Sequence, residues 1–123
     1  MLLHFDFSSD IPLYMQLRNQ IIIGIAKEQL KDGEKLPTIR ALSEESGINM
    51  MTVSKAYQLL RQEGYITTDR RKGTVVHCEL HSGAPSEETI SALHLQICEL
   101  RLSGMSRKEV LDLCGKLYEE GLQ

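Results

Sequence analysis

The hydrophobic positions of the first third of the chain repeat at helical intervals. Tyr14, Leu17, Ile21 and Ile25 are three or four residues apart, which predicts an amphipathic helix over residues 12–31. A proline at the first helical position is compatible with this element, because that position needs no backbone N–H donor. The Asp-Gly pair that follows the predicted helix is a stop signal.

Two further helices are predicted on either side of a single turn. The first covers residues 38–46 and begins with Thr38 as its N-cap. In the turn, Gly47 allows a positive φ angle and Asn49 can cap the next helix, which should end near Gly64. The inward face of that helix is expected to consist of Val53, Ala56, Tyr57 and Leu60. Two helices joined by a short glycine-containing turn are typical of a helix-turn-helix, whose second helix can enter the major groove of DNA.

The pattern changes to strand-like after this helix. Residues 65–68 and 74–78 are rich in β-branched and aromatic side chains, and residues 69–73 between them contain three adjacent cations. This pattern predicts a β-hairpin with a basic tip. A helix-turn-helix followed by such a hairpin is a winged helix.

The remaining residues predict a separate helical hairpin. Residues 81–85 have the composition of a linker, and a helix is expected over residues 86–103. Ser106 and Glu109 have the spacing of a capping box, so a last helix should begin there. The predicted fold is mainly α with a small β-hairpin wing: a winged helix-turn-helix DNA-binding domain over residues 1–80 and a two-helix dimerisation segment over residues 81–123. The expected dimerisation residues are Ile90, Leu93, Ile97, Leu100, Val110, Leu113 and Leu117.

Composition and charge modify this picture in one respect. The chain of 123 residues is 41% hydrophobic and 25% charged, which excludes collagen-like, disordered and membrane-spanning classes. Its net charge of −3 argues at first against nucleic acid. However, residues 35–73 contain seven Lys or Arg and four acids, whereas residues 81–123 contain four Lys or Arg and seven acids. The predicted DNA-facing part is therefore basic.

The other chemical signals are weak. Three cysteines without a CxxC pair favour a reducing compartment, and the N-terminal residues do not have the pattern of a signal peptide, so a cytoplasmic location is expected. His94 and Cys98 are four residues apart, but their spacing matches no dense ligand motif, and no metal and no cofactor are predicted. No catalytic constellation stands out, which argues against an enzyme.

Several segments together resemble the GntR family of bacterial transcription regulators. They are Ile11-Pro12-Leu13-Tyr14-x-Gln16-Leu17, Leu36-Pro37-Thr38-x-Arg40-x-Leu42, Gly47-Ile48-Asn49-x-x-Thr52-Val53-x-Lys55-Ala56-Tyr57 and Glu63-Gly64-Tyr65-Ile66. With its short helical tail, the chain looks most like the YtrA-type subfamily. The resemblance implies a homodimeric repressor that binds double-stranded operator DNA, often upstream of a transporter operon and its own gene. It identifies no small-molecule effector.

The resemblance and the exposed positions of the helix-turn-helix and wing also imply a set of DNA-binding residues. They are Thr38, Arg40, Asn49, Met50, Met51, Thr52, Ser54, Lys55, Arg70, Arg71, Lys72 and Gly73. Two departures bear on specificity. Met50 and Met51 stand where many relatives have an arginine or Pro-Asn, and Arg71 replaces the first glycine of the usual Gly-x-Gly wing tip.

Each of these features has a purely structural alternative. Arg40 could form a surface ion pair with Glu44, four residues along the same helix. The basic hairpin tip could simply be solvated. The row of hydrophobic side chains in the predicted helical hairpin could pack against the first helix of the same chain. The rival function is a protein-interaction adaptor whose winged helix has lost DNA binding.

Overall fold

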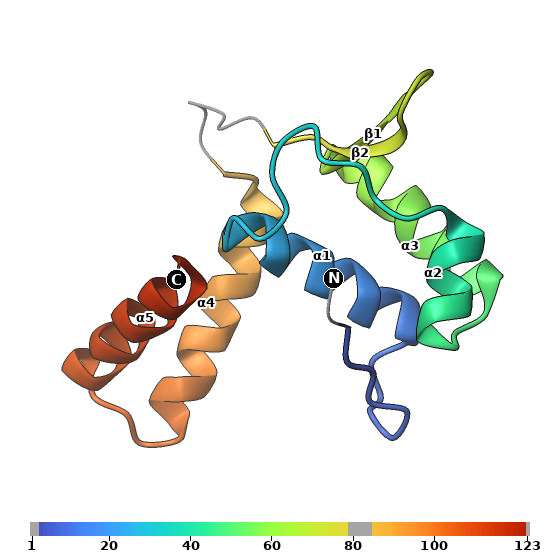
Figure 1. Ribbon diagram of the computed structural model, residues 1–123. Helices are drawn as coiled ribbons and strands as arrows, with labels where there is room; N and C mark the ends of the chain where they lie inside the picture. Colours follow the sequence, from blue (N-terminus) through green and yellow to red (C-terminus); the bar gives the residue numbers. More distant parts are fainter. Residues whose placement is uncertain (1–2, 79–84, 123) are drawn as a thin grey trace. The chain divides into compact units, whose positions relative to one another are not determined.

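The computed structural model describes residues 3–78 and 85–122. The chain forms two compact units, Met1–Glu79 and Leu80–Gln123. In chain order, the elements are α1 (Leu13–Ala26), α2 (Ile39–Ser46), α3 (Met50–Glu63), β1 (Ile66–Asp69), β2 (Gly73–Val76), α4 (Glu87–Leu102) and α5 (Arg107–Leu122) (Figure 1). This architecture confirms the predicted class: a three-helix winged helix-turn-helix followed by two helices.

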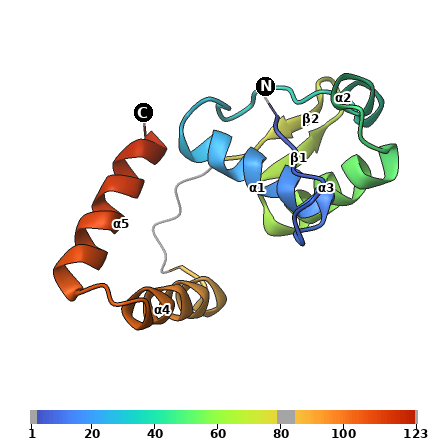
Figure 2. The same ribbon diagram turned by 90° about the horizontal axis from the view of Figure 1, so that it is seen from below.

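The core of the first unit joins all three of its helices and the hairpin. Leu17 and Ile21 of α1 are completely buried, as are Val53 and Leu60 of α3. Figure 2 shows α1 and α3 lying side by side, with the two strands next to them. Full burial of each of these aliphatic side chains stabilises the fold by about 1.5–3 kcal/mol. The face predicted for α3 is confirmed, since its buried residues are Val53, Ala56, Tyr57 and Leu60.

The expectation that the first helix reaches residue 31 is wrong. Helix α1 ends at Ala26, and Glu28 takes a positive φ of 62°. The carbonyl of Gly24 then accepts backbone hydrogen bonds from Gln29 (2.9 Å) and Leu30 (3.1 Å), which turns Leu30 back into the core. A Cβ atom on Gly24 would lie 3.1 Å from Cδ1 of Leu30, so the glycine leaves room for this return of the chain.

The hairpin forms with limits slightly different from those predicted: β1 lies one residue later, and β2 begins one residue earlier and ends two residues earlier. Strands β1 and β2 are antiparallel, with Ile66 opposite Val76 and Asp69 opposite Gly73. The far edge of β2 is also paired, because Lys35 bridges Val75 and the amide of Leu36 donates to the carbonyl of Thr74 at 2.9 Å. The segment before α2 therefore attaches the wing to the helices.

The second unit is a helical hairpin with little interior of its own. The predicted capping box is confirmed: the amide of Glu109 donates to Oγ of Ser106 (3.2 Å), and the amide of Ser106 donates to Oε1 of Glu109 (3.1 Å). Val110 is the one buried side chain among those described in this unit. Among the residues in the two described ranges, no helix is long and apolar enough to cross a membrane.

Candidate nucleic-acid interface

The N-termini of α2 and α3 are fixed by two of the predicted DNA-binding residues. Oγ1 of Thr38 accepts the amide hydrogen of Ala41 at 3.0 Å, and Oδ1 of Asn49 accepts that of Met51 at 2.6 Å. Both are side-chain N-caps, which satisfy amide groups that would otherwise lack an intrahelical partner. These two side chains therefore set where the helices begin, whatever else they contact.

The turn between α2 and α3 is held by local contacts. Gly47 ends α2 with a φ of 76°, and Ile48 is buried in the core. Oγ of Ser43 donates to the carbonyl of Ile48 at 2.5 Å. A turn anchored in this way holds α3 in a defined orientation toward solvent.

The first two turns of α3 present a mixed apolar and polar surface. Met50 is 49% exposed and Met51 is 79% exposed, while the buried face of the helix points the other way. Ser54 and Lys55 are also exposed, and Thr52 is half-buried. Both methionines therefore face solvent. A flexible thioether side chain at this place can contact the methyl group of thymine.

Lys55 is held against the first helix. Its Nζ atom lies 4.1 Å from the centroid of the Tyr14 ring, which is the geometry of a cation–π interaction. Arg18, one turn further along α1, forms an ion pair with Glu63 of α3, with Nε donating to Oε1 at 2.9 Å. Sequence reasoning identified neither contact, because each joins residues more than 40 positions apart.

Arg40 extends from α2 into solvent. Its Nε lies 3.7 Å from Oε1 of Glu44, and both side chains are more than 70% exposed. This is the surface ion pair that spacing predicted as the alternative to DNA contact. An exposed pair of this kind contributes only about 0–1 kcal/mol, so it leaves the guanidinium available to another anion.

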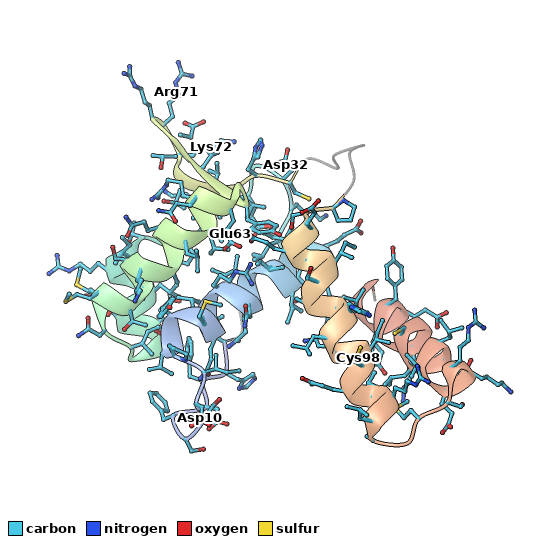
Figure 3. The ribbon with its side chains drawn as sticks, turned by 180° about the vertical axis from the view of Figure 1, so that it is seen from behind. Asp10, Asp32, Glu63, Arg71, Lys72 and Cys98 are labelled. Atoms are coloured by element: carbon cyan, nitrogen blue, oxygen red, sulfur yellow. The ribbon has the colours of Figure 1, made fainter. Side chains whose placement is uncertain are left out.

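The wing tip projects away from the helices, and Figure 3 shows Arg71 at its end with Lys72 beside it. Asp69 organises the turn: its Oδ1 accepts the amide hydrogens of Arg71 (2.7 Å) and Lys72 (3.1 Å). These bonds favour the charged carboxylate and hold the pKa of Asp69 below its ordinary value. An aspartate before a turn is a known turn signal that could have identified this role from the sequence.

Arginine in place of the first wing glycine is compatible with this geometry. Glu28 is the sole non-glycine residue with a positive φ in the described part of the chain, so Arg71 has an ordinary backbone conformation. The conformation that favours glycine is at Gly73, where φ is 85°. The side chains of Arg70, Arg71 and Lys72 are all exposed. Three cations at the end of a paired hairpin can follow a phosphate backbone.

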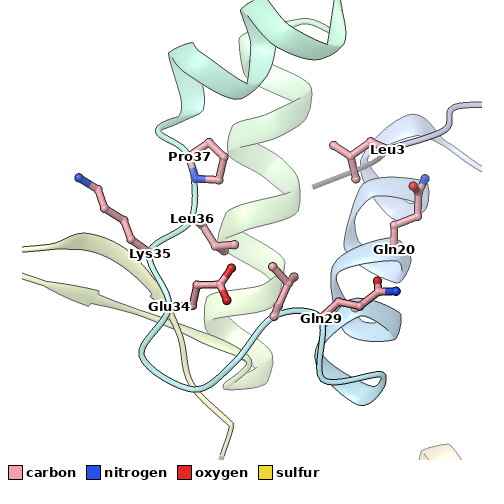
Figure 4. Close-up of a pocket in the computed structure, with 9 residues that line it drawn as sticks. Leu3, Gln20, Gln29, Glu34, Lys35, Leu36 and Pro37 are labelled. Atoms are coloured by element: carbon pink, nitrogen blue, oxygen red, sulfur yellow. The ribbon is translucent and has the colours of Figure 1, made fainter. Parts of the chain in front are cut away.

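A cavity of about 520 Å³ lies elsewhere in the same unit, between α1 and residues 29–37 (Figure 4). Its walls include Gln20 and Leu30, and Glu34 extends into it. It contains none of the predicted DNA-binding residues. In the described residues, no group of three His, Cys, Asp or Glu side chains is placed to hold a metal ion.

The predicted dimerisation residues differ in their exposure. Val110 is buried inside the α4–α5 hairpin, whereas Ile97, Leu100 and Leu113 are half-buried. The others are about half exposed, and they are Ile90 (50%), Leu93 (47%) and Leu117 (56%). The cysteines Cys78, Cys98 and Cys114 are free thiols.

This arrangement, with a capped helix exposed beside a second helix and a basic hairpin, defines a winged-helix DNA-binding protein. Residues 13–76 match the family model described as "Bacterial regulatory proteins, gntR family", and the chain belongs to that family. It is therefore a DNA-binding transcription regulator and not an enzyme.

Three relatives illustrate the likeness. The HTH-type transcriptional repressor YtrA of Bacillus subtilis is 39% identical over 75 residues, which cover 61% of this chain and 58% of that protein. YtrA from Sulfolobus acidocaldarius, a GntR-family transcription factor of solved structure, is 37% identical in sequence. The two structures superimpose with a TM-score of 0.60, and the match covers 96% of this chain and 97% of that one. A transcriptional antiterminator from Listeria monocytogenes, also of solved structure, is 28% identical in sequence. The TM-score is 0.88, and the match covers 100% of this chain and 94% of that one.

Proposed function

We propose that the protein is a cytoplasmic, homodimeric repressor that binds a two-fold symmetric operator through α3 and the wing. The observation that carries this proposal is the exposed N-terminal half of α3, where Met50, Met51, Ser54 and Lys55 all face solvent. The likeness to YtrA of Bacillus subtilis, which is called a repressor, supports repression rather than activation.

In this proposal, α3 lies in the major groove and the wing contacts an adjacent backbone or minor groove. Sequence discrimination comes from Arg40 and from the first two turns of α3. Phosphate contacts by Arg70, Arg71 and Lys72 supply much of the affinity, which should therefore fall steeply with salt.

The tail supplies the second half of the proposal. Of the twelve large hydrophobic side chains that are exposed in the described residues, seven lie in α4 and α5. A two-helix hairpin with so small an interior needs another surface to cover it. A second copy would do so, and it would place two recognition helices about 34–36 Å apart, one turn of DNA. The operator of a transporter operon and of the protein's own gene is the target suggested by the YtrA-type resemblance.

The test is selection of bound sequences from a random DNA pool, followed by fluorescence-anisotropy titration of the selected site. We expect a palindromic site with half-sites about 10 base pairs apart. Enrichment of no sequence would refute the proposal and favour a protein-interaction adaptor, in which the two exposed methionines contact a protein partner.

The contribution of the wing is tested by salt dependence. Replacing Arg70, Arg71 and Lys72 together by alanine should reduce the slope of log affinity against log salt concentration by about 1–3, since each lost phosphate contact removes about 0.9. Lys116→Ala, which removes an exposed cation from α5, is the control and should leave the slope unchanged. An equal slope for the wing variant would contradict the wing assignment.

A further inference from the structure

Helix α5 has an apolar row on its outer side that nothing in the described chain covers. Leu111 is 52% exposed and Tyr118 is 71% exposed, and they are seven residues apart, which places them on one face two turns apart. Between them lies Gly115, where a Cβ atom would meet only open space. This outer row of Leu111, Gly115 and Tyr118 is distinct from the inner face, where Val110 is buried against α4.

The charges at the two ends of α5 oppose the dipole of the helix. Arg107 and Lys108 lie in the first turn, at the positive end, and Glu119 and Glu120 lie near the negative end, where the last turn carries no basic residue. Glu109 offsets the first turn only in part. The ion pairs found among the described residues, Arg18–Glu63 and Arg40–Glu44, involve none of these four end charges. An isolated α5 is therefore polarised in the unfavourable direction.

These charges cannot neutralise one another within one helix. Lys108 and Glu119 are eleven residues apart, about 16 Å along the axis. A second copy of α5 in the opposite direction brings each lysine beside the glutamate of the other chain, and a two-fold axis near residues 113 and 114 forms both pairs at once. A parallel copy would place lysine against lysine and glutamate against glutamate.

We propose that two copies of the chain associate through antiparallel α5 helices, with Lys108 of each facing Glu119 of the other. This inference rests on the homodimer proposed above and specifies its contact surface. It also identifies what fills a hollow of about 480 Å³ at the closed end of the helical hairpin. That hollow is lined by Ile97, Arg101, Met105, Ser106, Arg107, Val110 and Leu111.

In this antiparallel register, Tyr118 of the second copy fills the hollow. With the axis near residues 113 and 114, position 118 of one chain lies opposite position 109 of the other, next to Arg107 and Val110. The hollow has an apolar floor and two arginines, and an aromatic ring can pack on both kinds of group. Tyr118, exposed in the single chain, would then be covered in the dimer.

The experiment is sedimentation equilibrium of the full chain for the wild type, Lys108→Glu, Glu119→Lys and the double variant. Each single change places like charges together twice per dimer and should raise the dimer dissociation constant about tenfold. The double variant restores both pairs and should return to within about threefold of the wild type. An equimolar mixture of the two single variants should form heterodimers of nearly wild-type affinity, because both pairs are then complementary.

Two further variants test the role of Tyr118 and provide a charge control. Tyr118→Ala should also weaken the dimer about tenfold, because it empties the hollow. Lys116→Glu changes a charge on the opposite side of α5 from the outer row and should leave the dissociation constant unchanged. Circular dichroism of each variant separates loss of association from loss of the helical hairpin.

The outcomes distinguish this inference from the proposed function. A monomeric wild type at micromolar concentration refutes the homodimer itself, whatever DNA it selects. A dimeric wild type with unaffected single variants, or a double variant that stays as weak as the singles, overturns the antiparallel arrangement and leaves the dimer standing.

Discussion

Tyr57 connects the recognition helix to the segment that holds both the wing and the start of α2. Its side chain is only 1% exposed, and its hydroxyl donates a hydrogen bond to the carbonyl of Pro37 at 2.7 Å. Pro37 follows the segment paired with β2 and precedes Thr38, the N-cap of α2. Tyr57→Phe removes the hydroxyl and keeps the ring, so it tests this bond without opening a large cavity.

At neutral pH the variant should be less stable by about 1–2 kcal/mol. Deleting the donor removes a hydrogen bond with a net value of about 0.5–1.5 kcal/mol, and it leaves the Pro37 carbonyl short of a partner, which costs about 1–3 kcal/mol when the group is fully buried. For a domain of this size, each kcal/mol lowers the melting temperature by about 4–8 °C.

The same residue gives a second, independent signature at alkaline pH. Burial, and secondarily the negative charge of Glu45, raises the pKa of Tyr57 from 10.0 to about 12. The folded state therefore holds the phenolic proton more tightly than the unfolded state does. This stabilisation is complete below pH 10 and is lost as pH rises to 12, to a total of roughly 3 kcal/mol. The phenylalanine variant has no proton to lose at this position.

Urea unfolding followed by circular dichroism at pH 7, 9, 10 and 11 measures both effects. The difference in unfolding free energy between wild type and variant should be largest at pH 7 and shrink above pH 10. Thr67→Val, which also removes a hydroxyl group but at an exposed position, should follow the wild type throughout. Equal stability at pH 7, or curves that stay parallel up to pH 11, would refute this account of Tyr57.

Three further predictions concern the DNA-binding surface. Asn49→Ala removes the N-cap of α3 and should lower the unfolding free energy by about 1 kcal/mol in thermal melts, whereas Asn49→Ser should retain most of it. Asp69→Ala should speed hydrogen exchange of the Arg71 and Lys72 amides, because their acceptor is lost. Since folding lowers the pKa of Asp69, the wild-type turn should loosen only as pH falls below about 3.8. Arg40→Ala should weaken operator binding by about 1–3 kcal/mol if the guanidinium reads a base. The melting temperature should stay unchanged, because the ion pair of Arg40 with Glu44 is exposed. Unaltered DNA affinity would remove Arg40 from the interface.

Local patterns were sufficient for the elements of this fold. The spacing of Val53, Ala56, Tyr57 and Leu60 fixes the buried face of α3, since a helical period leaves one face apolar. The first residues of α2, α3 and α4 follow from N-caps at Thr38, Asn49 and Ser86, whose hydrogen bonds span only two or three residues. Signals of this kind are contained in a few adjacent positions and can be read without knowledge of the tertiary structure.

The end of α1 shows where local patterns fail. The apolar period continues past Ala26 to Leu30, yet the chain turns there because Leu30 packs back onto Gly24. The energy of that turn comes from burial in the shared core, and this energy exceeds the weak local preference to continue the helix.

For the candidate site, the sequence by itself determined which residues are available and which elements carry them. The basic hairpin tip, the two methionines at the start of α3 and the capping asparagine were all predicted from type and position. Only the tertiary structure decided how these elements are held: the pairing of Lys35 with Val75, the contact of Lys55 with Tyr14 and the bond from Tyr57 to Pro37. These contacts join residues 20 to 41 positions apart along the chain, and such pairs meet only after the helices have packed around a common core.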